Sequence, residues 1–367
     1  MTLDEKLEWV SRQFCITGTY LEHRPICVGN VNKTYEVRFL QPNGAPKSYL
    51  VQNVNTYAFR KPVELMNNID QVTEHIRRKN PNVTALHFHH TRERKIYVED
   101  GENFWRMTNY IPSITYSSVN NRNVVRNAGM AFGDFQRQLS DFDINRLVET
   151  IPNFHNTRER YRQLEEAIAA DPKGRAAQVQ EEIDFLMAAR EDACLLTDLQ
   201  QQGKLPVRVT HNDTKINNVL FNPDNDEALV VIDLDTVMPG LMGNDFGDAI
   251  RFAANLAEED CPDAAKAGLN MDIFSAFAEG FLSRTAKTMT KLEAETLAQS
   301  CFCLTVELST RFLADYILGD PYFNIRYQEH NLDRTRCQIA LARDMIRNKD
   351  RMKMIVRQYV AAYAAER

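Results

Sequence analysis

Residues 209–220 read VTHNDTKINNVL, and residues 230–235 read VVIDLD. Asp213 and Asn218 stand five positions apart in the first segment, and Asp233 follows Asp213 by twenty positions, directly after three apolar residues. This spacing predicts a loop that carries a carboxylate and an amide, next to a buried strand whose end presents a second carboxylate. We therefore expect these three oxygen-bearing side chains to meet in one cleft.

Short β-rich segments precede this region of the chain. Residues 26–54 alternate apolar and polar positions and are broken at Gly29-Asn30 and at residues 42–44, as consecutive antiparallel strands are. Residues 63–76 have apolar positions at helical spacing, and the pattern ends at Asn80-Pro81. Asp100-Gly101 separates two further alternating segments and predicts a tight type I′ hairpin.

Long helical periodicities dominate after Pro112, with one short β region near 205–237 between them. A small antiparallel sheet with one main helix, followed by a larger and mainly helical lobe, predicts an α+β, two-lobed fold of the protein-kinase type. We expect an N-terminal nucleotide-binding lobe at residues 1–108 and a C-terminal catalytic and substrate-binding lobe at residues 109–367. The expected helices cover residues 123–140, 157–171, 174–202, 270–285, 290–318 and 333–364.

Composition narrows the class of protein. A chain of 367 residues with 44% hydrophobic and 26% charged residues is long enough for two packed lobes. The net charge of −6 and the scattered Lys and Arg argue against a nucleic-acid partner. Seven cysteines without CxxC spacing favour a reducing compartment. The amphipathic first segment and the lack of a long apolar run predict a cytoplasmic protein without a membrane partner, either a monomer or a homodimer.

The three oxygen-bearing side chains have the chemistry that phosphoryl transfer needs, which is positioning and charge neutralisation. Asp213 is placed to accept the proton of an acceptor hydroxyl, and Asn218 and Asp233 are hard oxygen ligands for Mg²⁺. Lys215 is expected to offset charge that develops on the transferring phosphate. Each residue alone has an ordinary structural alternative, such as a turn cap or a buried ion pair. Their joint order and spacing favour a catalytic site.

Asp245-Phe246-Gly247 has the letters of the magnesium motif of protein kinases. It lies thirty-two residues beyond Asp213, which is farther than the usual distance from a catalytic loop to the strand that carries the metal ligand. It also begins an apparently helical segment. We therefore expect Asp245 to cap that helix or to brace the catalytic loop, and not to bind the metal.

The nucleotide side is less distinctive. Residues 28–35 form a turn between two strands whose backbone N–H groups are candidates to face phosphates, although one glycine fits an ordinary hairpin equally well. Gln52 occupies the strand position where protein kinases place a phosphate-pairing lysine. The candidate nucleotide-binding residues are Gly29, Val31, Asn32, Lys33 and Gln52.

The catalytic loop, residues 232–236 and residues 239–251 together resemble the aminoglycoside phosphotransferase and choline kinase superfamily, and the similarity extends to residues 132–136 and 311–316. Within it, the sequence is most similar to the bacterial N-acetylhexosamine 1-kinases, which also carry glutamine at the Gln52 position. The resemblance implies ATP and Mg²⁺ as cofactors and phosphorylation of the anomeric hydroxyl of N-acetylglucosamine or N-acetylgalactosamine, for nucleotide-sugar salvage. It places Asn30, Asp213, Asp235, Arg311 and Tyr322 on the sugar side.

Alternatives stay open at this point. One is a kinase of another small alcohol, such as an aminoglycoside, choline or methylthioribose, and the acidic residues 258–263 are candidates to attract a cationic acceptor. Another is a catalytically silent nucleotide-binding protein, because Gln52 replaces the lysine. For Arg311 the alternative is a surface ion pair with Asp315, and for Tyr322 it is a place in the core.

Overall fold

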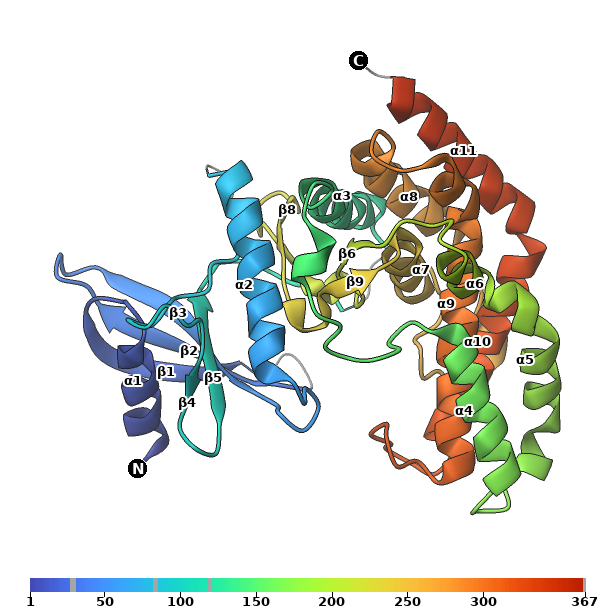
Figure 1. Ribbon diagram of the computed structural model, residues 1–367, viewed down its shortest axis with the longest axis horizontal. Coiled ribbons are helices and arrows are strands. Elements are labelled where there is room, and N and C mark those ends of the chain that lie inside the picture. Colours follow the sequence, from blue (N-terminus) through green and yellow to red (C-terminus); the bar gives the residue numbers. More distant parts are fainter. Residues whose placement is uncertain (27–30, 82–84, 118–119, 366–367) are drawn as a thin grey trace.

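The computed structural model describes residues 1–26, 31–81, 85–117 and 120–365. A five-stranded antiparallel sheet lies at one end of the molecule and a helical body forms the other end (Figure 1). Helix α2, Pro62–Lys79, lies between the sheet and the helical body (Figure 1). This arrangement confirms the predicted α+β class with a small sheet lobe and a larger helical lobe.

The sheet has the strand order β1-β2-β3-β5-β4. The bounds of its strands are β1 Thr19–Ile26, β2 Lys33–Leu40, β3 Pro46–Val54, β4 Val98–Glu99 and β5 Phe104–Asn109. One face packs against helix α1, Leu3–Gln13, through a cluster that includes Leu7, Val37, Val51 and Met107. Because side chains alternate along a strand, residues such as Gln52 and Arg106 face the opposite side of the sheet, toward α2 and the helical body.

Two details of the sheet differ from the prediction. Strand β1 begins at Thr19, ahead of the predicted region, and its apolar residues do not alternate because it is an edge strand with most side chains exposed. The predicted two-residue hairpin is wrong, since Glu99 pairs with Phe104 and four residues form the loop. The Asp100 carboxylate accepts hydrogen bonds from the backbone N–H of Glu102 and Asn103, which stabilises the longer loop.

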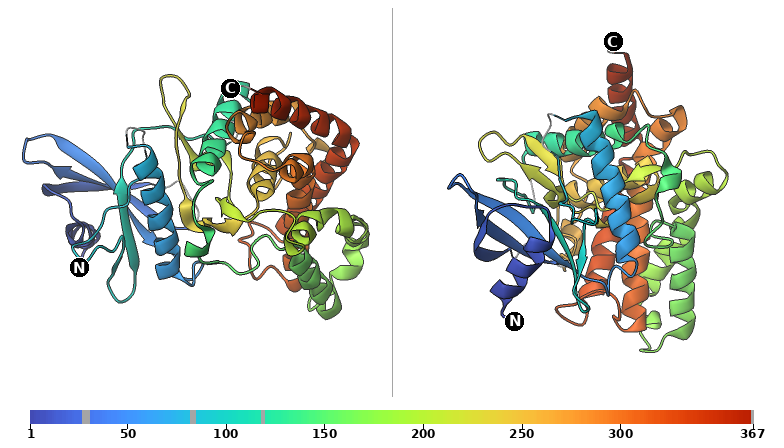
Figure 2. Two further views of the ribbon diagram at one scale, coloured as in Figure 1. Left: turned by 45° about the horizontal axis from the view of Figure 1, so that its top comes forward. Right: turned by 60° about the vertical axis from the view of Figure 1, so that its left-hand side comes forward.

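Nine helices of the described residues build the helical body. Helix α9, 28 residues long, is buried along most of its length at the centre (Figures 1 and 2). Helices α3 and α8 cross closely, and Gly129 permits this because a Cβ atom there would lie 2.4 Å from the Phe277 carbonyl oxygen. The helix bounds are α3 Arg122–Gln138, α4 Thr157–Ala170, α5 Gln180–Ala193, α6 Leu195–Gln201, α7 Met242–Ala253, α8 Met271–Thr285, α9 Lys291–Leu318, α10 His330–Arg347 and α11 Lys349–Ala365.

The predicted β region near 205–237 consists of two short antiparallel pairs. Strand β6, Arg208–Thr210, pairs with β9, Met238–Gly240. Strand β7, Val219–Phe221, pairs with β8, Ala228–Val231. The chain between β6 and β7 lies beside the turn after β8, because the Thr236 hydroxyl donates to the His211 carbonyl and the Ile232 N–H donates to the Asn218 carbonyl. In the described part of the chain, no helix combines the length and the apolar character that crossing a membrane requires.

Candidate active site

The loop between β6 and β7, residues 211–218, is held in place by hydrogen bonds to the buried Asp245 of α7. The Asp245 carboxylate accepts hydrogen bonds from the backbone N–H of His211 at 3.0 Å and of Asn212 at 2.8 Å, and from the Gln136 side chain. Its backbone carbonyl accepts a further bond from the Thr214 hydroxyl. Asp245 is the fourth residue of a helix that begins at Met242, and its carboxylate is occupied by the hydrogen bonds that brace the loop.

His211 joins this loop to the strand that leads to Asp233. The backbone N–H of Asp213 donates to His211 Nδ1 at 3.3 Å, so the ring proton is on Nε2 and is donated to the Ile232 carbonyl at 2.9 Å. The ring is buried and makes edge-to-face contacts with Phe132 and Phe135. This fixed imidazole sets the separation between the loop and the Asp233 turn.

Asp213 lies at the open side of the loop with its carboxylate held by two neighbours. Lys215 Nζ lies 3.0 Å from one carboxylate oxygen, and Asn218 Nδ2 donates to the other at 3.1 Å. The side chain of Asp213 stays 28% exposed, so an acceptor hydroxyl has access to it. The nearby Asp213 charge raises the pKa of Lys215, which keeps that ammonium charged beside the carboxylate.

Asp233 follows strand β8 in a left-handed backbone conformation, with φ of 60° and ψ of 58°. Such a conformation is uncommon for a residue other than glycine and is concentrated at functional sites. The backbone N–H of Ile232 donates to the Asn218 carbonyl at 2.9 Å, which places Asp233 next to Asn218. Burial, with the nearby carboxylates of Asp235 and Asp213, raises the pKa of Asp233 to about 6.

These residues fit a magnesium ion that is shared with phosphates. The Asn218 amide uses its nitrogen on Asp213, so its oxygen is left as a hard ligand. A cation would offset the repulsion that raises the pKa of Asp233. Among the described residues, no three His, Cys, Asp or Glu side chains are grouped to hold a metal alone. Mg²⁺ is commonly held by one or two carboxylates with phosphate and water oxygens, which matches this set.

The predicted nucleotide side of the site joins the sheet to the turn after Asp233. Asn32 donates from Nδ2 to the Asp235 carboxylate at 2.7 Å, and its Oδ1 accepts from the backbone N–H of Asn55. Arg106 of β5 forms a buried ion pair with both oxygens of Asp235. Asp235 was predicted to contact the sugar, but its carboxylate is occupied by these two partners. Its role at the sugar stays a prediction.

Arg106 was not among the residues predicted from the sequence. It is the single charged residue in the sequence Phe104-Trp105-Arg106-Met107, and a lone cation in a buried strand is a signal for an internal partner. Gln52 lies directly opposite in the sheet and accepts a hydrogen bond from Arg106 Nε at 2.9 Å. Val31 and Lys33 are exposed beside Asn32. Gly29 and Asn30 lie outside the described residues.

The predicted sugar side is a cluster of aromatic rings around a cation. The Arg311 guanidinium lies 5.9 Å from the ring centres of Phe154 and Tyr322 and 5.4 Å from that of Phe323. Asp315 does not pair with Arg311, because its carboxylate accepts from the backbone N–H groups of Tyr322 and Phe323. Tyr322 is 72% exposed, so the alternative of a core residue is wrong.

A known protein family matches most of this sequence. The sequence pattern of the family described as Phosphotransferase enzyme family matches residues 23–279, which span the sheet, the 211–218 loop and the Asp233 turn. The chain belongs to this phosphotransferase family. The predicted aminoglycoside phosphotransferase and choline kinase superfamily is thereby confirmed, and the chain is a phosphotransferase. The narrower resemblance to N-acetylhexosamine 1-kinases stays a prediction.

Solved structures share the fold of this phosphotransferase at low sequence identity. An amicoumacin kinase bound to AMP-PNP, Ca²⁺ and its ligand has a TM-score of 0.59 and 13% identity, covering 92% of this chain and 93% of that chain. A microcompartment-associated aminopropanol kinase has a TM-score of 0.57 and 13% identity, with 95% and 98% covered. A choline kinase from Cryptosporidium parvum has a TM-score of 0.54 and 13% identity, with 93% of each chain covered.

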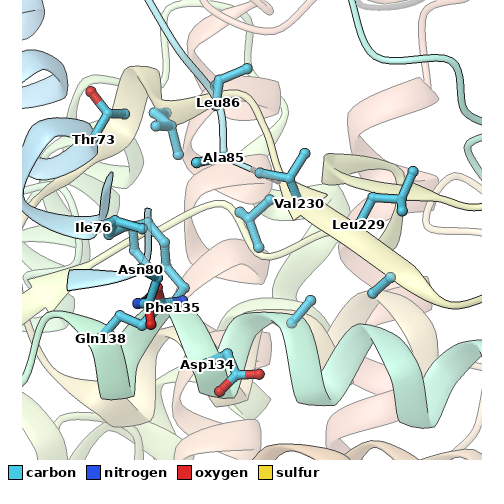
Figure 3. Close-up of a pocket in the computed structure, with 14 residues that line it drawn as sticks. Thr73, Ile76, Asn80, Ala85, Leu86, Asp134, Phe135, Gln138, Leu229 and Val230 are labelled. Atoms are coloured by element: carbon cyan, nitrogen blue, oxygen red, sulfur yellow. Dashed lines mark hydrogen bonds between the residues drawn. The ribbon is translucent and has the colours of Figure 1, made fainter. Parts of the chain in front are cut away.

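Two cavities of the phosphotransferase adjoin the site. An apolar one of about 160 Å³ lies between α2, α3 and β8, where Thr73, Ile76, Phe135 and Val230 line it (Figure 3). Phe135, which packs against His211, and Leu234, the neighbour of Asp233, belong to its lining, whereas Asp213, Asn218 and Asp233 do not. A more polar one of about 340 Å³ is lined by Phe154, His155 and Asn212, so it runs from the Arg311 cluster to the residue before Asp213.

His155 connects this second cavity to the catalytic loop. Its Nδ1 lies 2.8 Å from the buried carboxylate of Glu307, and its Nε2 lies 3.3 Å from the Asn212 carbonyl. Glu307 also accepts a hydrogen bond from the Thr157 hydroxyl. Sequence reasoning missed this dyad because its two members are 152 positions apart and belong to no local motif.

The electrostatics of Asp233 give a stability prediction. Its folded pKa of about 6 is above the ordinary 3.8, so the ionised form destabilises the metal-free protein at neutral pH. We expect Asp233→Asn to raise the melting temperature in EDTA at pH 7.5, by about 1–2 °C for each kcal/mol of repulsion relieved in a chain of this length. The gain should disappear as the pH falls from about 6 toward 3.8, since Asp233 then becomes protonated in the wild type.

The measurement is scanning fluorimetry of the wild type, Asp233→Asn and the exposed control Asp224→Asn, with EDTA or Mg²⁺ and AMP-PNP. Stabilisation by the magnesium nucleotide should be lost in Asp233→Asn alone. Full stabilisation of that variant would contradict Asp233 as a metal ligand.

Proposed function

We propose that this phosphotransferase uses ATP and Mg²⁺ to phosphorylate the anomeric hydroxyl of an N-acetylhexosamine, N-acetylglucosamine or N-acetylgalactosamine, and releases the sugar 1-phosphate for nucleotide-sugar salvage. The observation that carries the kinase chemistry is the exposed Asp213 carboxylate, held between Lys215 and Asn218 beside Asp233. These groups supply a proton acceptor, a nearby cation and two oxygen ligands at one place.

The residues divide the reaction between them. Asp213 accepts the proton of the acceptor hydroxyl, and Lys215 lies within reach of the charge that develops as the phosphoryl group moves. Asn218 and Asp233 would hold Mg²⁺, which when bound neutralises the nucleotide phosphates. Asp245 and His211 fix the loop, so these groups need little reorganisation when substrate binds.

The charges around the predicted sugar side support an uncharged acceptor over a cationic one. Arg160 donates to the Phe154 carbonyl and the Arg311 guanidinium lies over the Phe154 ring, so two guanidinium groups lie in the same region. Burial and the nearby charge of Arg311 lower the pKa of Arg160. A cationic acceptor such as choline or an aminoglycoside would be repelled there.

Three of the four carboxylates of the acidic stretch at 258–263 are paired with basic side chains, and Glu258 is exposed without an ion-pair partner among the described residues. Glu259 pairs with Arg251, Asp260 with His330 and Arg326, and Asp263 with Lys266. These basic partners offset the charge that a cationic acceptor would otherwise meet. This pairing of the acidic residues favours an uncharged sugar over a cationic acceptor such as choline or an aminoglycoside.

A substrate panel tests the acceptor. The purified protein is incubated with Mg²⁺, ATP and one acceptor at a time: N-acetylglucosamine, N-acetylgalactosamine, glucose, methylthioribose, choline or an aminoglycoside. We expect ADP to form with the N-acetylhexosamines, with equimolar loss of reducing ends, because phosphate on the anomeric oxygen blocks ring opening. ADP formation with the reducing end retained and no inorganic phosphate released would place the phosphate on another hydroxyl, since ATP hydrolysis would release inorganic phosphate.

Other outcomes of the panel decide the remaining alternatives. Phosphorylation of cationic acceptors alone would replace the hexosamine proposal with one of the other small-alcohol kinases. Tight binding of magnesium nucleotide without turnover on any acceptor would favour the catalytically silent protein.

The Arg311 cluster gives a second prediction for the acceptor. We expect Arg311→Gln to raise KM for the sugar by about tenfold, which corresponds to about 1.4 kcal/mol of lost binding, with KM for ATP unchanged. The matched control is Arg326→Gln, since Arg326 is exposed on the neighbouring loop and pairs with Asp260 at 3.5 Å. An equal change in both KM values, or an effect of the same size in the control, would contradict a sugar contact by Arg311.

A further inference from the structure

We propose that Arg106 supplies from strand β5 the fixed positive charge for the nucleotide phosphates, and that Gln52 is the residue that orients it. The inference rests on the proposed function only in that the nucleotide is a triphosphate bound with a divalent cation. It assigns a nucleotide-binding role to a residue that the sequence patterns did not mark, and it explains the glutamine at the strand position where a lysine is otherwise expected.

The register of the sheet places the two side chains together. Gln52 of β3 and Arg106 of β5 are direct partners in the antiparallel pair, so both side chains are on the same face. That face is opposite to the one where Val51 and Met107 pack under α1. The positive charge of Arg106 is therefore on the same face of the sheet as a lysine at position 52 would be, but on the neighbouring strand.

Gln52 holds the guanidinium in one orientation. Its Oε1 accepts from Arg106 Nε at 2.9 Å, and its Nε2 donates to the Thr34 hydroxyl at 3.0 Å. The amide is therefore fixed with its oxygen toward the arginine. A lysine at position 52 would remove this acceptor and place a second positive charge beside the first, so glutamine at 52 and arginine at 106 fit one another.

Arg106 also reaches the metal side of the site. Its two terminal nitrogens pair with the two oxygens of Asp235, which is two residues beyond Asp233. The side chains of both partners are 3% exposed, so this is a desolvated pair in which the arginine position is well defined. The guanidinium thus lies between the sheet that covers the nucleotide and the turn that carries Asp233.

The arginine has donors left for a phosphate. A guanidinium carries five N–H groups, and Gln52 and Asp235 use three of them. Of the remaining two, one has only Met66 Sδ as a partner, at 3.9 Å, and neither has an oxygen acceptor among the described residues. Phosphate and carboxylate oxygens are the acceptors that match the geometry of a guanidinium.

The competing explanation is a purely structural bond that ties the sheet to the turn at residues 234–236. Removal of Arg106 would then weaken nucleotide binding only by loosening the lobes, and a positive charge placed at position 52 would not restore it. If Arg106 supplies the charge, a lysine on the neighbouring strand should restore nucleotide affinity without restoring the bond to Asp235.

The experiment measures the affinity for AMP-PNP with Mg²⁺ by isothermal titration calorimetry, with no acceptor present. We expect Arg106→Met to weaken binding by about 10–100-fold, because a hydrogen bond to a charged group contributes about 1.5–3 kcal/mol. The double variant Gln52→Lys/Arg106→Met should recover at least tenfold of that loss. The control Arg38→Met removes a cation of the same sheet that pairs with Glu22, and it should bind as the wild type does.

The same series of variants includes a control for misfolding. Arg106→Met leaves the buried Asp235 unpaired, so every variant is also made with Asp235→Asn, where both charges are gone. If the single variant does not fold, the comparison is between Asp235→Asn and Asp235→Asn/Arg106→Met. Unchanged affinity without Arg106 in a folded protein, or a double variant as weak as Arg106→Met, would overturn the proposal. Because no acceptor is present, an incorrect choice of sugar would leave this result unaffected.

Discussion

Asp213→Asn is expected to lower kcat by about 10²–10⁴-fold, the contribution that a positioned general base makes. The substitution keeps the shape of the side chain and its hydrogen bond with Asn218, and it removes the group that accepts the hydroxyl proton. The affinity for AMP-PNP with Mg²⁺ should change little, because Asn218 and Asp233 are retained. Steady-state turnover and calorimetry on the same preparation measure the two quantities.

The matched control is Asp224→Asn, an exposed carboxylate on the loop between β7 and β8. It changes the net charge by the same amount and should leave both turnover and affinity as they are. Retained turnover in Asp213→Asn would contradict the base assignment. A parallel loss of nucleotide affinity would instead mean that Asp213 acts mainly as a metal ligand.

Asp245→Ala is expected to have the largest effect on the structure of the site, although Asp245 contacts no substrate. The change leaves the N–H groups of His211, Asn212 and Gln136 without an acceptor in a buried place. Each unsatisfied group costs about 1–3 kcal/mol, so we expect a loss of several kcal/mol of stability. Loop residues 211–218 should then lose their fixed geometry, and kcat should fall together with the melting temperature.

The control for this change is Asp272→Ala, since Asp272 also lies in the first turn of a helix but is exposed. Both substitutions remove a favourable charge at a helix N-terminus, so their difference isolates the brace. A melting temperature of Asp245→Ala equal to that of Asp272→Ala would contradict the brace. Partial recovery in Asp245→Asn, which keeps one acceptor oxygen, would support it.

The fold and the position of the loop could be predicted because they depend on local patterns. Apolar periodicity predicted α3, α4, α8 and α9 to within a few residues. The spacing of Asp213, Asn218 and Asp233 reflects a loop, a short strand pair and a turn, all close in sequence. Asp245 was expected to cap its helix or to brace the loop, because its distance along the chain and its helical surroundings did not fit a strand end, and its carboxylate does accept hydrogen bonds from that loop.

Contacts between distant segments could not be predicted in the same way. The partner of Arg106 is 129 residues away, and the partner of His155 is 152 residues away, so neither pair leaves a local signature. The four-residue loop after Glu99 depends on where the Asp100 carboxylate points, with Lys6 Nζ only 2.6 Å from it. The sequence shows Asp-Gly there but not the lysine that is brought in by α1.

The most direct test of the site is a crystal structure with AMP-PNP, Mn²⁺ and N-acetylglucosamine, in which the anomalous signal of manganese locates the metal. We predict the ion bonded to the Asn218 and Asp233 oxygens and to the nucleotide phosphates, with the Asp213 carboxylate within about 3 Å of the anomeric hydroxyl. Manganese held by other residues, or a sugar whose anomeric oxygen lies away from Asp213, would contradict it.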